Sequence, residues 1–312
     1  MTSTPAPDDR AEGRQGVLHG AAAYVLWGVF PLYFPLLEPA GTLEILGMRM
    51  AWSLIAMLVV LRMTGGFRRT LAVVRDRRRF RLLALAAVLV SVNWGTYIYG
   101  VNTGHVVETS LGYFINPLFT ILLGVLVLRE RLRPAQWLAV AIGAAAVLVI
   151  AVDYGRPPWI ALILAFSFGM YGFSKKRAAV GAVESLAVET GVQLPIAAVL
   201  IAIVAAQGNL VFGTRWPTSL LLVGTGLVTV IPLLFFAAAT RRLPLTILGL
   251  LQYLAPILQF AVGVGIRHEK LPTAELVGFC LVWLALIVLT VDSLRSQRRA
   301  RQLARAAEAV SV

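Results

Sequence analysis

The sequence predicts an all-α integral membrane protein in which ten transmembrane helices form two inverted five-helix repeats. Three observations lead to this prediction: apolar residues dominate the chain, basic residues gather in alternate connections, and landmark residues recur at a nearly constant offset. Together they define an N-terminal tail at 1–16, a first repeat at 17–152, a second repeat at 153–292 and a basic C-terminal tail at 293–312.

The composition excludes an ordinary soluble domain. Of 312 residues, 59% are hydrophobic and 14% are charged, and the mean hydropathy is +0.81. Soluble domains carry about 25% charged residues, so most of this surface must face lipid, and the membrane bundle itself must carry the function. Cys280 is the single cysteine, which excludes an intrachain disulfide and a cysteine-cluster metal site.

Apolar runs of about 20 residues define the helices, because that length crosses a hydrocarbon core of about 30 Å. The runs predict helices near 17–36, 43–62, 82–101, 108–128, 135–152, 158–174, 184–206, 218–239, 244–265 and 273–291. The first run is too long for a signal-peptide core, so we expect a retained helix. Both polar tails are expected to be mobile, and the arginine-rich last one is a candidate for a basic amphipathic helix on the cytoplasmic leaflet.

The distribution of charge predicts the orientation. The net charge is +13, but Lys and Arg lie between apolar runs, where they bias topology rather than bind nucleic acid. With the N-terminus inside, 23 of the 28 Lys and Arg residues fall in inner segments, four fall in outer loops, and Arg49 lies inside a span. We therefore expect both termini in the cytoplasm and an even number of spans in the plasma (inner) membrane.

An internal repeat relates the two halves of the chain. Landmarks match at offsets of 139 to 141 residues: Gly28 with Gly169, Glu44 with Glu184, Arg49 with Glu189, Pro117 with Pro256, and Glu130 with Glu269. Because each repeat holds five spans, an odd number, the second copy must enter the membrane upside down. Inverted repeats of this kind are typical of alternating-access carriers, whose substrate site lies near the midplane between the halves.

Three segments resemble RarD-type permeases. They are Glu108–Leu118 (ETSLGYFINPL), Leu164–Gly172 (LAFSFGMYG) and Leu248–Pro256 (LGLLQYLAP). The resemblance covers roughly 17–292, and RarD proteins are similar to the EamA-domain members of the drug/metabolite transporter superfamily. It implies ten helices in two inverted EamA-like halves and transport of a small solute.

The chain departs from this family pattern at several positions. Met48 stands where relatives tend to carry His before the arginine, which weakens a proton-coupling scheme built on histidine. Pro35 replaces a Lys, so a cation at the outer rim is missing. Arg129 and His268 stand where EamA repeats often place Gly, which puts the turn geometry in doubt more than the fold.

Arg49, in the second predicted span, is the leading candidate for contact with a solute. An arginine at the centre of a span costs about 2.5–3.5 kcal/mol on insertion scales, so such residues usually face the bundle interior. Its forked guanidinium would suit an anionic or carbonyl-bearing solute. The alternative is a snorkelling side chain that reaches the outer interface.

Glu189, the repeat partner of Arg49, is the candidate for proton coupling, since a carboxylate inside an apolar span can serve as a proton carrier. Gln193 follows one turn later on the same face. The alternative is a structural hydrogen bond between spans. A direct Arg49–Glu189 salt bridge is not expected, because the inverted repeat places the two near opposite membrane faces.

Polar and aromatic residues in other spans complete the predicted site. Asn93, Trp94 and Tyr97 form a stripe that could bind a solute, or else serve only interhelical hydrogen bonds and aromatic packing. Trp27 and Tyr171, at mid-span in the first and sixth helices, either line the same cavity or fill space.

Two prolines lie at matching places in the repeats. Pro117 and Pro256 should each kink a helix and free a carbonyl group, and polar residues stand just before them, namely Asn116, Gln252 and Tyr253. Broken helices at matching positions in two halves indicate a transporter site. Kinking alone would explain the prolines but would not require the polar neighbours.

The sequence thus favours a secondary carrier that exports or exchanges a small organic solute, metabolite or drug. Glu130 and Glu269 are expected to be structural. The chain has no metal-ligand pair, phosphate loop or nucleophile elbow, so we expect neither a cofactor nor enzyme activity. A non-transporting assembly or regulatory protein is the main alternative. The expected partners are a solute and the lipid bilayer, and a homodimer stays open.

Overall fold

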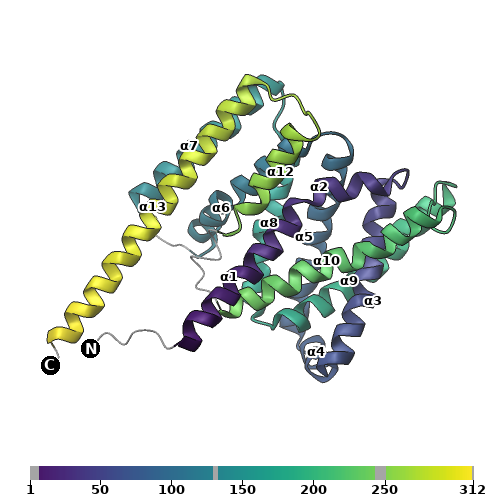
Figure 1. Ribbon diagram of the computed structural model, residues 1–312, viewed down its shortest axis with the longest axis horizontal. Helices are drawn as coiled ribbons and strands as arrows, with labels where there is room; N and C mark the ends of the chain where they lie inside the picture. Colours follow the sequence, from purple (N-terminus) through teal and green to yellow (C-terminus); the bar gives the residue numbers. More distant parts are fainter. Residues whose placement is uncertain (1–6, 129–132, 243–250, 311–312) are drawn as a thin grey trace. The chain divides into compact units, whose positions relative to one another are not determined.

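The computed structural model describes residues 7–128, 133–242 and 251–310, and every regular element in these ranges is a helix. The elements are α1 (Pro7–Gly28), α2 (Phe30–Tyr33), η1 (Phe34–Leu37), α3 (Thr42–Thr64), α4 (Phe67–Arg75), α5 (Arg77–Asn102), α6 (Val106–Leu128), α7 (Pro134–Tyr154), α8 (Trp159–Ala178), α9 (Ala182–Ala206), α10 (Trp216–Arg242), α12 (Leu254–Gly265) and α13 (Thr273–Val310) (Figure 1).

Six of the described helices are long and apolar enough to cross a membrane, namely α3, α5, α7, α9, α10 and α13, and a bent pair would make a seventh. α8 and α12 contribute shorter apolar stretches, Trp159–Lys175 and Leu254–Gly265. The predicted span 244–265 begins outside the described residues. The chain is therefore a helical, multi-pass membrane protein, while ten spans and an inverted repeat stay predictions.

The first predicted span, 17–36, is not one continuous helix. α1 ends at Gly28, and the chain continues as α2 and η1 at an angle of 40°. Pro31 and Pro35 are the second residues of these two short elements. Proline lacks an N–H and clashes with the preceding turn, so two prolines four residues apart favour a break here.

Two further differences concern the segments outside the predicted spans. The arginine-rich connection after α3 contains the short helix α4, which the apolar runs do not predict because the segment is rich in charge. At the other end, α13 does not stop near residue 291 but continues to Val310, so the basic tail is helical over most of its length.

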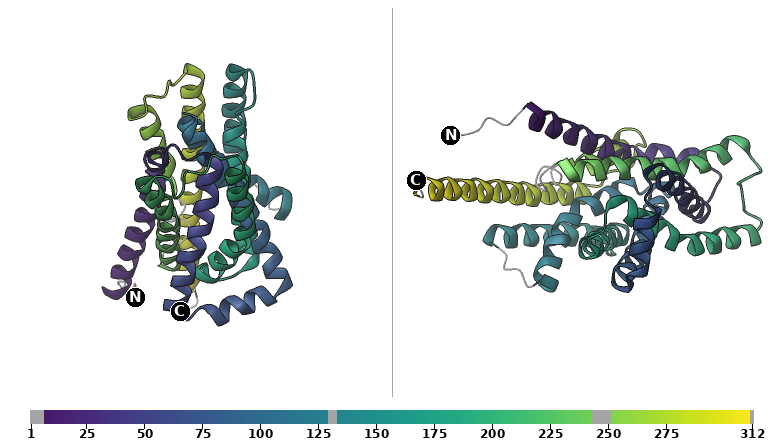
Figure 2. Two further views of the ribbon diagram at one scale, coloured as in Figure 1. Left: turned by 90° about the vertical axis from the view of Figure 1, so that its right-hand side faces the viewer. Right: turned by 90° about the horizontal axis from the view of Figure 1, so that it is seen from below.

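The described helices pack as two units. Unit 1 holds Met1–Tyr113 and Ile160–Lys270; within it α3 packs against α9 and α10, α1 against α10 and α12, and α5 against α9. Unit 2 holds Phe114–Trp159 and Leu271–Val312, and in it α7 and α13 run side by side (Figures 1 and 2). Each unit draws segments from both predicted repeats, so this division leaves the repeat boundaries untested.

Glycines allow the closest helix contacts in unit 1. A Cβ atom on Gly226 of α10 would lie 2.5 Å from the carbonyl oxygen of Trp52 on α3, and one on Gly47 would lie 2.9 Å from Ile201 of α9. Small residues at such crossings let two backbones approach. The approach of α10 to α3 brings the next turn of α10 within reach of Arg49.

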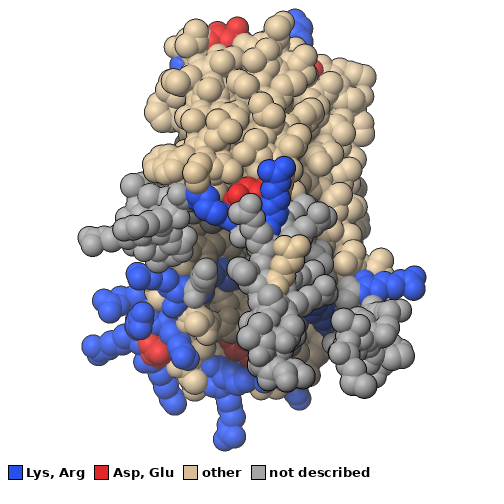
Figure 3. Space-filling model, turned by 90° about the vertical axis from the view of Figure 1, so that its left-hand side faces the viewer, with Lys and Arg blue, Asp and Glu red and all other residues tan. Residues whose placement is uncertain are grey.

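The outer faces of several helices are apolar. On α7 and α13, Leu148 is 65% exposed and Ile287 is 59% exposed. On the face seen in Figure 3, uncharged residues form broad continuous areas and Lys and Arg gather in separate clusters. Exposed apolar bands on long helices are suited to contact with lipid chains.

Candidate functional site in the helical bundle

Arg49 lies inside unit 1, on the part of α3 that faces α10. Its side chain is buried, with 3% of the residue exposed, and its Nε donates a hydrogen bond of 2.7 Å to the Thr229 hydroxyl. That hydroxyl in turn donates to the Thr225 carbonyl at 2.8 Å, which turns its lone pairs toward the guanidinium. No ion pair joins Arg49 to a carboxylate of the described chain.

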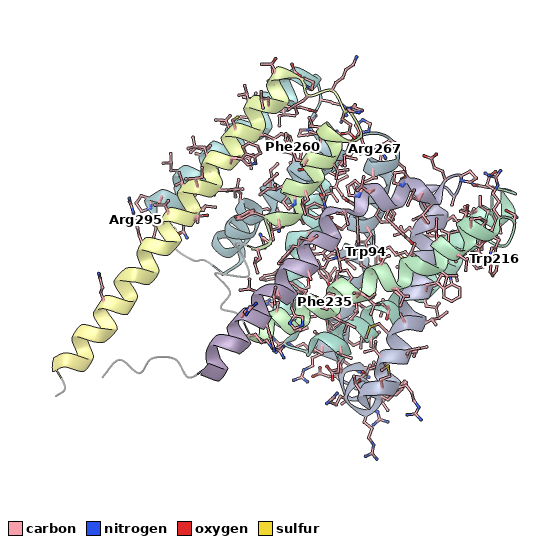
Figure 4. The ribbon with its side chains drawn as sticks, in the orientation of Figure 1. Trp94, Trp216, Phe235, Phe260, Arg267 and Arg295 are labelled. Atoms are coloured by element: carbon pink, nitrogen blue, oxygen red, sulfur yellow. The ribbon has the colours of Figure 1, made fainter. Side chains whose placement is uncertain are left out.

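Aromatic rings surround the guanidinium. The Arg49 Cζ lies 4.2 Å from the ring centroid of Trp94, which is labelled in Figure 4, and 5.4 and 5.7 Å from those of Phe30 and Phe34. Each of these distances lies within the range of a cation–π contact. Trp94 therefore lies against Arg49, and the short elements after the bend supply the other two rings.

Tyr97 continues this group of aromatic residues. Its ring lies 5.9 Å from both Phe34 and Tyr113, and only 2% of the residue is exposed. The buried hydroxyl has no hydrogen-bond partner among the described residues. Burying a hydroxyl without a partner costs roughly 1–3 kcal/mol, so Tyr97 is a candidate to donate to a bound molecule.

Asn93, by contrast, is fully engaged between helices. Its Nδ2 donates to the Leu164 carbonyl and to the Ser167 hydroxyl, both at 3.1 Å, and its Oδ1 accepts from the Tyr113 hydroxyl at 3.0 Å. These bonds tie α5 to α8 and α6. The geometry favours the interhelical alternative for Asn93, and its role toward a solute stays a prediction.

Glu189 lies in a second buried cluster, together with Tyr171. The Ser185 and Tyr171 hydroxyls donate to its carboxylate at 2.6 and 3.1 Å, and Lys175 Nζ lies 3.0 Å from Oε1. Lys175 also donates to the Tyr171 hydroxyl at 2.9 Å. Tyr171 thus pairs with the proton-coupling candidate, and no hydrogen bond between described residues joins it to Arg49.

Arg49 and Glu189 have separate hydrogen-bond partners, and no ion pair between described residues joins the two. Gln193, one turn beyond Glu189, donates to the Ser91 hydroxyl at 3.0 Å.

The remaining predicted residues lie around α1, α6 and α12. Trp27 packs against Tyr24 and Phe236, at centroid distances of 5.3 and 5.8 Å. Gln252 and Tyr253 are half-buried in the turn that precedes α12. Asn116 is buried in α6, in unit 2, and the side chain of its neighbour in α6, Pro117, lies outside the described residues.

Pro256 does not kink a continuous helix as predicted. It lies in the first turn of α12, directly after the turn at Gln252 and Tyr253. The first turn tolerates proline, because its N–H groups have no partner within the helix. The Pro256 carbonyl accepts a hydrogen bond of 2.9 Å from Ser110, so α6 satisfies this acceptor.

Three carboxylates satisfy backbone N–H groups at helix starts or in loops. Glu269 accepts from Val106 and Val107, at 2.9 and 2.8 Å. Glu44 accepts from the loop residues Val211 and Phe212, with Phe212 at 2.7 Å. Glu108 accepts from Ile160 at the start of α8, at 3.1 Å. The contacts of Glu269 are of the structural kind expected; Glu130 lies outside the described residues.

Sequence reasoning missed several members of the two clusters. Phe30, Phe34 and Thr229 carry no motif, since aromatic residues and threonine are common in apolar helices. Lys175 directly follows the sixth predicted span, where it is one of several basic residues of an inner segment. A reading of helical spacing would have placed it one turn after Tyr171.

A multi-pass bundle with buried charged clusters matches a known class of membrane proteins. The model of the EamA-like transporter family matches residues 14–152. The Protein RarD of Streptomyces exfoliatus is 53% identical over 294 residues, covering 93% of this chain and 92% of that one. An uncharacterized transporter of Pseudomonas aeruginosa is 43% identical over 293 residues, covering 93% and 97%.

The chain therefore belongs to the EamA-like transporter family, in its RarD-type branch. A solved crystal structure of a protein aligns with a TM-score of 0.58 at 20% identity, over 88% of this chain and 97% of that one. At that level of identity the alignment shows a shared fold.

Proposed function

We propose that this chain is a secondary carrier that exports or exchanges a small organic solute across the plasma membrane, with both termini in the cytoplasm. Arg49, Trp94 and Tyr97 form the core of the proposed solute site. The observation that carries the proposal is a buried arginine within a membrane span, held by one hydroxyl and three aromatic rings. Ionisable groups inside spans are costly, and they usually mark the path of a solute or an ion.

The helix contacts support the inverted repeat on which alternating access would depend. In an inverted repeat α1, α3, α5 and α6 would correspond, in that order, to α8, α9, α10 and α12. A contact between a helix of the first half and a helix of the second should then recur between their two counterparts. The contact of α3 with α10 has its counterpart in α9 with α5. The contact of α1 with α12 has its counterpart in Gly112 of α6, whose Cβ would lie 2.8 Å from the carbonyl oxygen of Ala161 on α8.

A non-transporting membrane protein is the second candidate. The engagement of Asn93 and Gln193 in bonds between helices favours it, because a solute-binding side chain should keep free hydrogen-bonding groups. The Arg49 group argues against it, since a purely structural bundle gains nothing from a guanidinium without a carboxylate.

Solute counterflow in proteoliposomes tests the proposal. The purified full chain would be reconstituted and offered a panel of radiolabelled organic acids, amides and amines. We expect counterflow of at least one member, and its loss in Arg49→Ala. Arg62→Ala, an exposed arginine on the same helix, is the matched control and should keep it. Normal counterflow by well-folded Arg49→Ala would remove Arg49 from the site.

A further inference from the structure

Within the described part of the chain no carboxylate neutralises the Arg49 guanidinium, and this feature identifies a ligand class. Of its nitrogen atoms, Nε has a hydrogen bond, to Thr229, and no described protein group accepts from Nη1 or Nη2. A guanidinium has five N–H donors, and burial of an unpaired charge costs several kcal/mol. The rings of Phe30, Phe34 and Trp94 offset part of that cost, but they neutralise no charge.

The second cluster shows what a balanced arrangement looks like in the same chain. Lys175 lies 3.0 Å from the Glu189 carboxylate, so its charge is neutralised within the protein. At the repeat offset of 140 residues, Glu189 corresponds to Arg49; at the offset of 141 that pairs Gly28 with Gly169 in the first and sixth spans, Lys175 corresponds to Phe34. The first repeat therefore has a cation where the second has an anion, and it has an uncharged residue where the second has the neutralising lysine.

None of the buried carboxylates described in unit 1 is available to neutralise Arg49. The buried acidic groups of unit 1 are engaged elsewhere: Glu44 with Val211 and Phe212, Glu108 with Ile160, and Glu189 with Lys175. The missing negative charge must come from outside the described protein.

A second donor lies beside the same rings. Tyr97 packs against Phe34, the ring that Arg49 also faces, and its buried hydroxyl lacks a partner among the described residues. A carboxylate accepts from a guanidinium fork and from a hydroxyl at the same time. Trp94 and Phe34 offer flat apolar surface for whatever the carboxylate is attached to.

We propose that the Arg49 site binds an organic monoanion, a carboxylate attached to a planar apolar body. The carboxylate accepts from Arg49 and Tyr97, and the apolar body packs against the ring of Trp94. This inference rests on the proposed carrier function for its biological meaning, but the binding itself can be measured without transport.

A matched series of three probes tests the charge requirement. Indole-3-acetate, indole-3-acetamide and tryptamine share one ring and differ in charge. Thermal unfolding of the purified full chain, followed over a range of probe concentrations, gives the affinity of each, since a ligand of the native state raises the unfolding midpoint. We expect the carboxylate to bind more tightly than the amide, by on the order of tenfold, and the amine to bind more weakly than either.

Variants connect this preference to the named residues. In Arg49→Met the ratio of carboxylate affinity to amide affinity should fall to about one. Arg62→Met, on the same helix, should keep the ratio of the parent protein. Arg49→Lys should lie between, because it retains the charge without the fork. If Arg49→Met does not fold, Tyr97→Phe provides the second variant and should weaken binding of the carboxylate more than binding of the amine, because the ammonium group cannot accept from the hydroxyl.

The outcomes separate this inference from the carrier proposal. Equal binding of carboxylate and amide by the parent protein, or an unchanged preference in Arg49→Met, would overturn the anion site. Absence of carboxylate binding would overturn it as well. Counterflow of the amide or amine without the carboxylate would leave a carrier in place and refute the anion class. Carboxylate binding lost in Arg49→Met would support the site even if no solute crossed the membrane.

Discussion

Lys175 Nζ lies 3.0 Å from Glu189 Oε1, and this ion pair joins α8 to α9 within the bundle. The Tyr171 hydroxyl contacts both partners, at 2.9 Å from Lys175 Nζ and 3.1 Å from Glu189 Oε2. The candidate proton carrier therefore has a cation beside it, supplied by the preceding helix. Any role in coupling must begin from a carboxylate that is already paired.

Removing Lys175 should destabilise the protein more than removing both partners. Lys175→Met leaves the buried carboxylate without its cation and should lower the free energy of unfolding by about 3 kcal/mol. This is the low end of the range for breaking a buried ion pair, because the lysine side chain is 27% exposed. Lys175→Met combined with Glu189→Gln should recover most of that loss. The unfolding midpoints of the purified variants measure both effects.

The ion pair of Arg69 and Glu184, in which the arginine is exposed, is the matched control. The Arg69 side chain is 64% exposed, so Arg69→Met should cost less than about 1 kcal/mol. A double variant no more stable than Lys175→Met alone would contradict the assignment of a buried pair.

Glu189→Gln tests proton coupling directly. The amide keeps nearly the shape of a protonated carboxyl group, so solute flux should lose its response to an imposed pH gradient while solute exchange survives. Flux in proteoliposomes with and without the gradient gives the answer. A variant that responds to the gradient like the parent would show that Glu189 has only a structural role.

Thr229→Val should weaken the hold on Arg49. It removes the hydroxyl that accepts from Nε, a hydrogen bond to a charged group that contributes about 1.5–3 kcal/mol. We expect a lower unfolding midpoint and reduced solute counterflow. Thr225→Val, one turn away on α10, loses a bond to the Leu222 carbonyl within its own helix and should change counterflow little. Equal effects of the two substitutions would count against a specific role for Thr229.

Reporter fusions test the predicted orientation. A reporter joined after Arg78 or Arg299 should be active as a cytoplasmic fusion, because both positions follow arginine-rich inner segments. A reporter after Gly104 or Arg156 should behave as external. A fusion after residue 299 that reads as external would refute an even number of spans.

The extent of α3 was predictable from sequence, and the break in the first span could have been. The apolar run 43–62 corresponds to α3 at Thr42–Thr64, and Gly65, with a φ of 62°, ends the helix in the left-handed conformation. Pro31 and Pro35 were visible within the first run, but the apolar pattern extends across them. A hydropathy pattern indicates which residues contact lipid, but it does not show where a helix bends.

The site was less predictable because its residues meet across helices. Arg49 and Trp94 stood out individually, one as a charge in a span and the other as an aromatic neighbour of Asn93. Which of them touch depends on the rotation of α3 and α5 about their axes, and Gly226 and Gly47 set how closely α10 and α9 approach α3. A threonine such as Thr229 acquires its role only once that approach is known.

The unbroken course of α13 has a practical use. Its 38 residues extend about 57 Å at 1.5 Å per residue, which exceeds a hydrocarbon core of about 30 Å. A folded partner fused in helical continuity at Val310 would be carried on a stiff arm rather than a flexible tether. Each residue deleted from the junction would rotate that partner by about 100° about the helix axis. The orientation of the partner can therefore be chosen, and its added mass would make a small membrane protein large enough for electron microscopy.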